Sequence, residues 1–152
     1  MRITVCAVGR LKKGPWRALV DEYIKRLNWS VTVVEVEAKA GLSGTALKDE
    51  EGQLLLKNIP EDSYSITLDE KGRESTSREL SQKIEHIQHH GGGKICFVIG
   101  GADGLSDAVK SRANQSISFG RTTWPHMMVR VMLLEQVYRA QQILNGHPYH
   151  RE

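Results

Sequence analysis

The chain has 152 residues, of which 39% are hydrophobic and 26% are charged, and its formal net charge is +3. These values are ordinary for a soluble globular protein, and the length favours a single domain that spans residues 1–152. The apolar runs, such as residues 95–99, are far shorter than the ~20 residues of a membrane-spanning helix. Because the N-terminus also shows no signal-peptide pattern, we expect a cytoplasmic protein without a membrane partner.

Strands and helices are predicted in alternation along the chain. Short β-branched or continuous apolar runs predict strands, and apolar residues at helical spacing predict helices. In chain order we expect a strand at 3–8, a helix from Pro15, a strand at 31–38, a helix at 46–58, a strand at 63–68, a helix opened by Thr76, a strand in KICFVIGG (94–101), a short helix capped by Ser106 or Asp107, a strand at 116–119 and a last helix at about 126–145. This order indicates an α/β fold with a mainly parallel sheet flanked by helices.

Cysteine and histidine give no pattern that predicts a disulfide or a metal site. Cys6 and Cys96 lie in apolar, strand-like runs without a CxxC spacing, which favours buried, reduced thiols. His86 and His90 are four residues apart, but the sequence offers no third ligand nearby. Histidines also suit the negative C-terminal end of a helix. We therefore predict that the protein binds no metal.

The basic residues are unevenly distributed. No acidic residue occurs between Asp107 and Glu135. The basic residues in that interval are Lys110, Arg112, Arg121 and Arg130. We expect a locally positive stretch of surface, which is compatible with nucleic acid binding without requiring it.

Two glycine-containing segments follow predicted strands. The first is VIGGADGL (98–105), and its glycines allow a ligand to approach the backbone closely at the C-terminal end of a parallel strand. It matches neither a P-loop nor G-x-G-x-x-G, so it suits a nucleoside better than a phosphate; the alternative is a tight turn. The second is SFGRTTWPH (118–126), a loop whose backbone N–H and C=O groups can recognise the edge of an adenine; the alternative is a plain connection.

The last helix and the tail complete the set of candidate segments. Two apolar stripes on the helix predict either a homodimer interface or a central core helix, with Arg130 and Arg139 facing a ligand or a partner. The tail HPYHRE (147–152) contains residues that can stack on a base, bind phosphate and move a proton. Such a tail is either held in place for chemistry or is a solvated end of accidental composition.

In these segments the chain resembles the RlmH family of SPOUT-superfamily RNA methyltransferases, essentially from end to end. The motifs that carry the resemblance are AVGRLK, EGQ (51–53), TLDEKG (67–72), VIGGADGL, SFGRTTWPH, RVMLLEQVYRA and HPYHRE. The resemblance implies a small α/β domain with a C-terminal trefoil knot, a rare exception to chain-threading rules, and a homodimer. It further implies S-adenosylmethionine as the cofactor. The implied reaction is methylation of N3 of a pseudouridine in the helix 69 loop of 23S ribosomal RNA, on assembled ribosomes.

The resemblance also assigns expected roles to individual residues. Implied cofactor contacts fall on Leu68, Gly100, Phe119, Gly120, Arg121, Thr122, Thr123 and Trp124. For the removal of the N3 proton we favour His150 and Arg151, with Tyr149 as an orienting partner and Arg139 and His126 as second choices. We expect the tail of one subunit to complete the pocket of the other. Two alternatives remain, a non-catalytic ribosome-binding dimer and a methyltransferase of another RNA such as transfer RNA.

Overall fold

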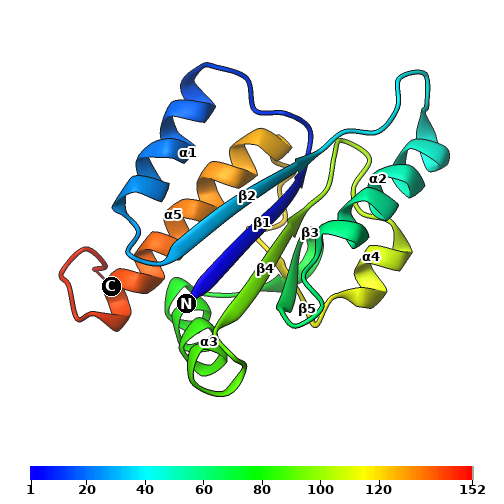
Figure 1. The fold of residues 1–152 in the computed structure, drawn as a ribbon. Helices are drawn as coiled ribbons and strands as arrows, with labels where there is room; N and C mark the ends of the chain where they lie inside the picture. The colour runs from blue at the N-terminus through cyan, green and yellow to red at the C-terminus, as the bar shows by residue number, and fades with distance from the viewer. Residues whose placement is uncertain (152) are drawn as a thin grey trace.

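The computed structural model describes residues 1–151. Strands and helices alternate along these residues (Figure 1). The strands are β1 (Arg2–Val8), β2 (Ser30–Val36), β3 (Tyr64–Glu74), β4 (Lys94–Ile99) and β5 (Gln115–Ser118). The helices are α1 (Pro15–Arg26), α2 (Gly44–Asn58), α3 (Ser77–His90), α4 (Asp107–Arg112) and α5 (His126–Leu144). The predicted alternation is thus confirmed, including the Thr76 capping box at the start of α3 and the Ser106 cap of α4.

The five strands form one parallel sheet in the order β2-β1-β4-β3-β5. Helices α1, α3 and α5 pack together on one face, and α2 and α4 pack on the other (Figure 1). Side chains alternate between the faces, because successive residues of a strand point to opposite sides. Val5 and Phe97 therefore belong to the core under α1, α3 and α5, whereas Cys6 and Val98 belong to the core under α2 and α4.

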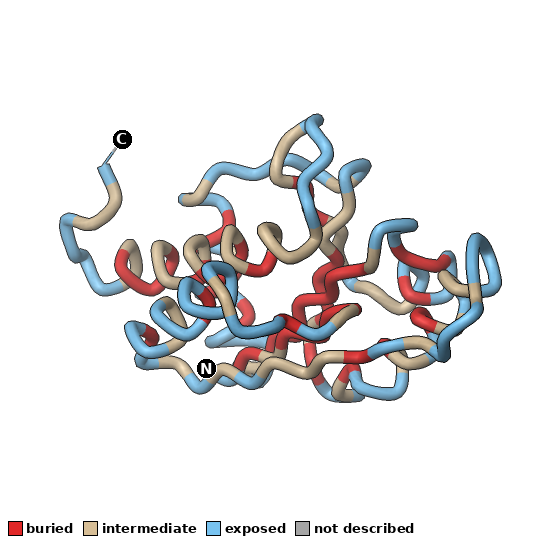
Figure 2. The backbone as a smooth tube through the Cα atoms, turned by 90° about the horizontal axis from the view of Figure 1, so that it is seen from above, coloured by how far each residue is buried: buried red, intermediate tan, exposed pale blue. Residues whose placement is uncertain are grey.

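The buried part of the chain is concentrated in the central strands (Figure 2). In β4, every residue after Lys94 is buried, as expected for a strand covered on both faces. Cys6 and Cys96 are free, fully buried thiols with their sulfur atoms 3.6 Å apart, as predicted. Within residues 1–151, no helix is long and apolar enough to cross a bilayer.

Strand β3 is longer than predicted. The prediction ended the strand at residue 68, but pairing with β5 resumes at Arg73 after a register shift. The sequence between Leu68 and Arg73 is polar and is typical of a loop, which explains why the prediction ended the strand too early. A Cβ atom at Gly72 would lie 2.5 Å from the carbonyl carbon of Ile117, so only glycine allows the two backbones to approach this closely. Helix α2 also begins earlier than predicted, at Gly44.

Arg130 corrects a further prediction. We expected it to face a ligand or a partner, but its side chain is buried inside the chain, with 1% exposure. Its Nη1 donates to Glu35 Oε2 at 2.7 Å, and its Nη2 donates to the carbonyl oxygens of Val8 and Gly9 at 2.7 and 2.5 Å. The first turns of α5 are therefore joined to the ends of β1 and β2.

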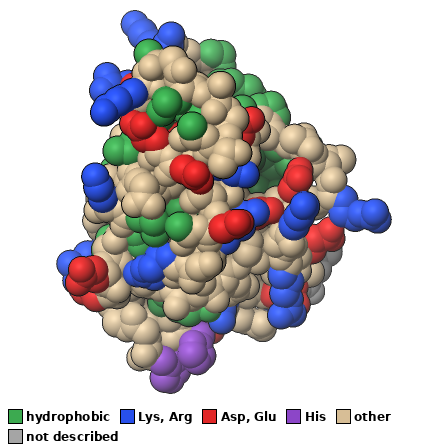
Figure 3. Space-filling view, turned by 90° about the vertical axis from the view of Figure 1, so that its right-hand side faces the viewer, with side chains coloured by type: hydrophobic (Ala, Val, Ile, Leu, Met, Phe, Trp, Pro, Cys, Tyr) green, Lys and Arg blue, Asp and Glu red, His purple; other side chains and the backbone are tan. Residues whose placement is uncertain are grey.

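The predicted positive stretch between Asp107 and Glu135 is only partly available at the surface, since Arg130 is buried and Arg121 is exposed. Lys110 forms an ion pair with Asp69 at 2.8 Å, and Arg112 donates to Ser65 Oγ at 3.1 Å. On the face shown in Figure 3, acidic side chains lie among the basic ones. Linear charge spacing was misleading because partners from distant segments meet these cations.

Candidate active site

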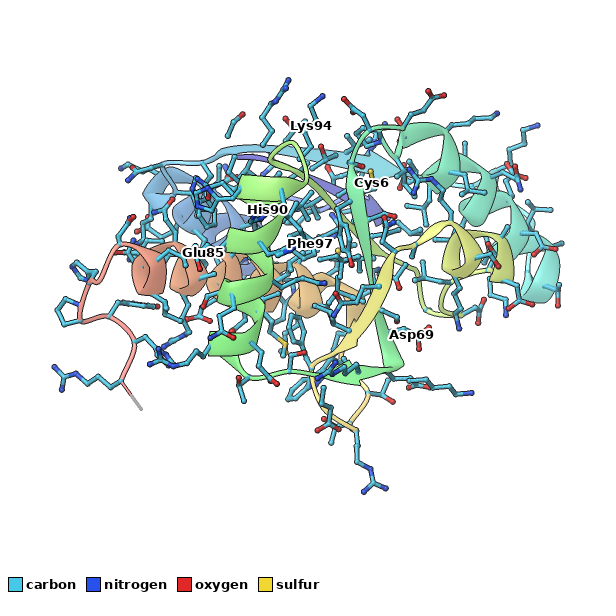
Figure 4. The ribbon with its side chains drawn as sticks, turned by 90° about the horizontal axis from the view of Figure 1, so that it is seen from below. Cys6, Asp69, Glu85, His90, Lys94 and Phe97 are labelled. Carbon is cyan, nitrogen blue, oxygen red and sulfur yellow. The ribbon has the colours of Figure 1, made fainter. Side chains whose placement is uncertain are left out.

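A cavity of about 740 Å³ opens at the edge of the sheet where β4 and β5 end and β3 shifts register. Leu68 of β3, Ile99 of β4 and Ile117 of β5 line its floor. Asp69 marks this edge in Figure 4, at the opposite end of the sheet from Lys94, where β4 begins. Open parallel sheets bind ligands at this edge, and the volume lies within the ~300–1,000 Å³ of small-molecule sites. We call this space the carboxyl-edge cavity.

The glycine turn predicted from VIGGADGL forms one wall of the cavity. The amide of Gly104 donates to the carbonyl oxygen of Gly101 at 3.1 Å and closes the turn. A Cβ atom at Gly100 would lie 2.9 Å from the carbonyl carbon and oxygen of Gly104. Because no side chain fits there, the turn requires glycine, and the cavity wall at this point is bare backbone. Gly100 lines the cavity, as the predicted cofactor role requires.

The loop between β5 and α5 forms the opposite wall. The predicted cofactor residues that line the cavity here are Phe119, Gly120, Thr122, Thr123 and Trp124. Ser118 Oγ donates to the carbonyl oxygen of Gly120 at 2.7 Å, and the Trp124 indole donates to that of Phe119 at 3.2 Å. These bonds brace the loop. Arg121 is exposed and, of the predicted cofactor residues, is the one that does not line the cavity.

His126, at the start of α5, is the one predicted proton-transfer residue that lines the cavity. Burial, followed by the nearby charge of Arg130, lowers its pKa below the ordinary value. The imidazole is therefore neutral near neutral pH, a state in which one ring nitrogen can accept a proton. A Cβ atom at Gly9 would lie 3.5 Å from His126 Nε2, so the AVGR segment packs against this histidine.

Several charged lining residues were missed by sequence reasoning. They are Lys48, Asp69, Glu70, Lys71, Asp103 and Lys110. Burial acts to raise the pKa of Asp69, but hydrogen bonds from Lys110 and from the amide of Lys71 outweigh it and hold that pKa below the ordinary value. The TLDEKG motif carried the signal, because its polar residues directly follow the apolar part of β3.

The tail is held against α5 by a compact set of contacts. Glu135 Oε1 accepts from Arg139 Nη2 at 2.6 Å and from the Tyr149 hydroxyl at 3.1 Å. The Arg139 guanidinium lies 4.8 Å from the centre of the Tyr149 ring, and Arg139 Nη1 lies 3.3 Å from His150 Nδ1. Three predicted site residues, Arg139, Tyr149 and His150, thus meet at one place, and we call them, with Glu135, the tail cluster. Glu152 lies outside the described residues.

The chemistry of the tail cluster limits what its members can do in this arrangement. A guanidinium has only donors, so His150 Nδ1 must accept and the ring proton of a neutral His150 lies on Nε2. His150 is then an oriented donor at Nε2 rather than a base. Burial, followed by the charge of Glu135, raises the pKa of Tyr149 to about 12, which keeps the phenol protonated. Arg151 is exposed.

The tail cluster and the carboxyl-edge cavity are separate within one chain. Neither Arg139 nor any described residue of the tail lines the cavity. Glu135 follows His126 by nine residues, which is about 13 Å along a helix. A second cavity of about 480 Å³ lies between them; it includes Glu135 and shares the wall formed by residues 117–120. No three metal-ligating side chains group together anywhere in residues 1–151.

Comparison with protein families matches residues 1–150 to the family described as "Predicted SPOUT methyltransferase". The chain is also 48% identical over 151 residues to the ribosomal RNA large subunit methyltransferase H of Rhodospirillum centenum, covering 99% of each chain. The chain belongs to the RlmH family of SPOUT methyltransferases. Proteins of the same name from Paramagnetospirillum magneticum and Clostridium botulinum (strain Kyoto) are 46% and 45% identical to it, each over 99% of this chain and at least 99% of its own length. The resemblance read from the motifs is confirmed.

Two solved structures of methyltransferases have the same fold as this SPOUT family member. A probable methylase family protein from Haemophilus influenzae superposes with a TM-score of 0.54 at 13% identity, over 99% of this chain and 70% of that chain. The second structure is the ribosomal RNA small subunit methyltransferase E of Neisseria gonorrhoeae, bound to S-adenosyl methionine. It superposes with a TM-score of 0.53 at 11% identity, over 95% of this chain and 66% of that chain. At such low identity they support the fold alone, and the predicted α/β class is confirmed. The trefoil knot stays a prediction.

Proposed function

We propose that this protein is a cytoplasmic methyltransferase that transfers a methyl group from S-adenosylmethionine to ribosomal RNA of the large subunit. The proposed target atom is N3 of a pseudouridine in the helix 69 loop of 23S RNA, on assembled ribosomes. The names of relatives that are 45–48% identical over nearly the whole chain support the substrate class. The observation that carries the proposal is the carboxyl-edge cavity, in which a bare glycine turn faces a backbone-rich loop.

The residues of the cavity fit the proposed cofactor. S-adenosylmethionine supplies, when bound, a methyl group on a positively charged sulfur atom. Gly100 presents bare backbone to the cavity, because the turn leaves no room for a side chain there, and a nucleoside can make close contact with such a wall. The braced 119–125 loop can offer backbone groups to an adenine edge, and apolar Leu68 and Ile117 can exclude water. Holding the reacting atoms about 3–3.5 Å apart and aligned is the main catalytic task of such a site.

The N3 proton of the target base must leave before or during methyl transfer. His126 lies at the cavity with a lowered pKa, which keeps the ring unprotonated and so able to accept a proton. In the tail cluster, Arg139 donates to His150, which suits orientation and charge stabilisation instead. Nearby cations such as Arg139 and Arg151 would lower the pKa of N3, so that water or hydroxide can take the proton.

The separation of the tail cluster from the cavity supports a homodimer with composite sites. In this proposal the tail of one subunit completes the cavity of its partner. Exposed Trp16 and Leu19 on α1, with half-buried Val131 and Met132 on α5, provide apolar surface for such contacts.

The deciding experiment measures methyl transfer from labelled S-adenosylmethionine to ribosomes that lack the modification. The full chain is compared with a chain that ends at Gly146. We expect the full chain to methylate and the short chain to bind cofactor without methylating. Equal methylation by both would assign the chemistry to other residues, first to His126. Mapping methylated nucleosides in RNA from a deletion strain separates 23S RNA from transfer RNA as the target.

A mutant heterodimer tests the composite site. One subunit carries Gly100→Ala, whose added methyl group would meet the backbone of Gly104 and so distort the cavity wall, and the other lacks residues 147–152. Each parent homodimer should be inactive. Recovery of about half the activity supports sharing, because one complete cavity and one complete tail then meet at a single site. No recovery would place each site within one subunit.

A further inference from the structure

Glu51 is a carboxylate that the proposed mechanism does not use. It lies on α2 and is 8% exposed. A Cβ atom at Gly101 would lie 3.0 and 3.1 Å from its two carboxylate oxygens. The carboxylate therefore packs directly behind the glycine turn, and Gly101 itself lines the carboxyl-edge cavity.

The position of Glu51 is fixed by its neighbours. The next residue, Gly52, is buried and lies so close to Ser106 that no side chain would fit there. Ser106 in turn is the N-cap of α4. Helix α2 is thus pressed against the start of α4, and the Glu51 side chain is held between this contact and the turn.

The hydrogen bonding of the Glu51 carboxylate is incomplete. Among the described residues, none hydrogen-bonds to its buried Oε2. Burial, followed by the charge of Asp103 in the glycine turn, raises the pKa of Glu51 above the ordinary value. A buried, unpaired acidic group that packs against a cavity wall costs folding free energy, and such groups concentrate at functional sites.

A cation in the cavity would remove this cost. Charge interactions are strong where water is excluded, and Gly101 places no side chain between the carboxylate and the cavity. Ligands that differ by one positive charge would therefore bind with different affinities. A neutral ligand of the same shape would gain little from the carboxylate.

We propose that Glu51, assisted by Asp103, is the counter-charge by which the cavity favours the positively charged sulfonium of S-adenosylmethionine over the neutral thioether of S-adenosylhomocysteine. This inference rests on the proposed function. Donor and product share their nucleoside and amino-acid parts, so the glycine turn and the 119–125 loop hold both equally. The charge behind the turn distinguishes them and favours exchange of product for donor.

Binding calorimetry with three ligands tests the proposal. Two of the ligands are cations at the reacting position: S-adenosylmethionine, and sinefungin, which carries a charged amine near the position of the sulfonium. They are compared with S-adenosylhomocysteine, whose sulfur atom is uncharged. For Glu51→Gln we expect binding of the two cations to weaken about tenfold, with the affinity for S-adenosylhomocysteine within about twofold of wild type. The matched control is Asp49→Asn, which removes the same charge from an exposed position of α2 and should leave all three affinities unchanged.

Each outcome separates a different explanation. Equal weakening of all three ligands would mean that Glu51 only shapes the turn, and unchanged affinities would mean that it has no role; either result overturns the inference. Binding of none of the ligands by the wild type would overturn the proposed function itself.

Folding of the variant is checked in parallel. Glu51→Gln removes an unpaired buried acid, so its thermal midpoint near neutral pH should equal or exceed that of wild type. Should this variant fold poorly, Asp103→Asn tests the same charge pair from the exposed side of the turn. It should weaken binding of the two cations about twofold, less than Glu51→Gln would, because solvent screens Asp103. If the affinities of Asp103→Asn for the two cations, relative to its affinity for S-adenosylhomocysteine, equal those of the wild type, the result would count against the proposal.

Discussion

The two ends of α5 are joined to the rest of the molecule by different kinds of contact. At the N-terminal end, beside the carboxyl-edge cavity, Arg130 is fully buried and is bonded to Glu35 and to two carbonyl groups. At the C-terminal end, Arg139 pairs with Glu135, and both side chains remain partly exposed. An arginine–glutamate pair is present at both ends, but the Arg130 side chain is 2% exposed whereas that of Arg139 is 24% exposed; the two glutamates are similarly exposed, at 23% and 19%.

This difference suggests a division of labour between the two regions. A cavity must hold its ligand in a fixed geometry, so it is built from a sheet edge and glycine backbone, and the buried Arg130 beside it joins distant segments. A tail that has to meet a partner or a substrate must be released at small cost. Partly exposed ion pairs provide a weak attachment, because water competes for both charges.

The largest effect is expected from Arg130→Met. The substitution leaves Glu35 partly buried without its cation, which should cost about 3–5 kcal/mol in the free energy of unfolding. Burial acts to raise the pKa of Glu35, but bonds from Leu11 and Arg130 hold it below the ordinary value. Its contribution to wild-type stability is therefore present above the unfolded pKa and lost as the pH falls through the folded pKa.

Urea denaturation of Arg130→Met and of the double variant with Glu35→Met measures this effect. The double variant should recover much of the lost stability, because no charge is left unpaired. If Arg130→Met lost no more unfolding free energy than Arg139→Met does, the contrast between the two ends of α5 would be wrong.

A smaller but local effect is expected from Gly100→Ala. The added methyl group would meet the backbone of Gly104 at 2.9 Å, and such overpacking costs about 1–3 kcal/mol. Calorimetry should show cofactor binding weakened by at least about tenfold, while the tail contacts are unaffected. Ala108→Ser, at an exposed position of α4 that does not line the cavity, is the control and should bind normally.

Arg139→Met should affect activity far more than stability. Its ion pair with Glu135 is partly exposed, so the loss in unfolding free energy should be about 0.5–1 kcal/mol. Single-turnover methylation should fall about a hundredfold, because the guanidinium orients His150 and supports the tail. A normal rate would show that the tail cluster is structural only.

The smallest change is expected from Tyr149→Phe, which removes one hydrogen bond to Glu135 and should cost less than about 1 kcal/mol. In the wild type, absorbance titration should find one tyrosine with a pKa of about 12. Because that pKa is raised, the stability from this contact is fully present below the ordinary pKa of ~10 and is lost as the pH rises through the folded pKa. Glu135→Gln should lower the pKa of Tyr149; no change would contradict the assigned contact.

Much of the fold and part of the site followed from local sequence. Strand and helix periodicity, the Thr76 capping box and the glycine turn are properties of neighbouring residues, so they are readable without a structure. The 119–125 loop was predicted to contact a ligand for the same reason, and in the structure it lines the cavity. Arg121 was an exception, because the direction of a loop side chain depends on how the loop is braced.

The residues whose behaviour was misread or missed have partners that are distant in the chain. Arg130 looked like a surface cation, and its acid lies 95 positions away. The sequence did not indicate that Glu51 is buried, because its burial arises where α2 meets the glycine turn after β4. Charge pairing and burial of this kind depend on sheet order, which places β1 between β2 and β4.

The sequence by itself determined the family, the alternation of elements and the glycine turn that shapes the carboxyl-edge cavity. The tertiary structure alone decided which charges are buried, where β3 resumes its pairing and how far the tail cluster lies from the cavity. The physical reason is that backbone preferences act over a few residues, whereas desolvation and charge pairing are set by whichever distant segments the sheet brings together.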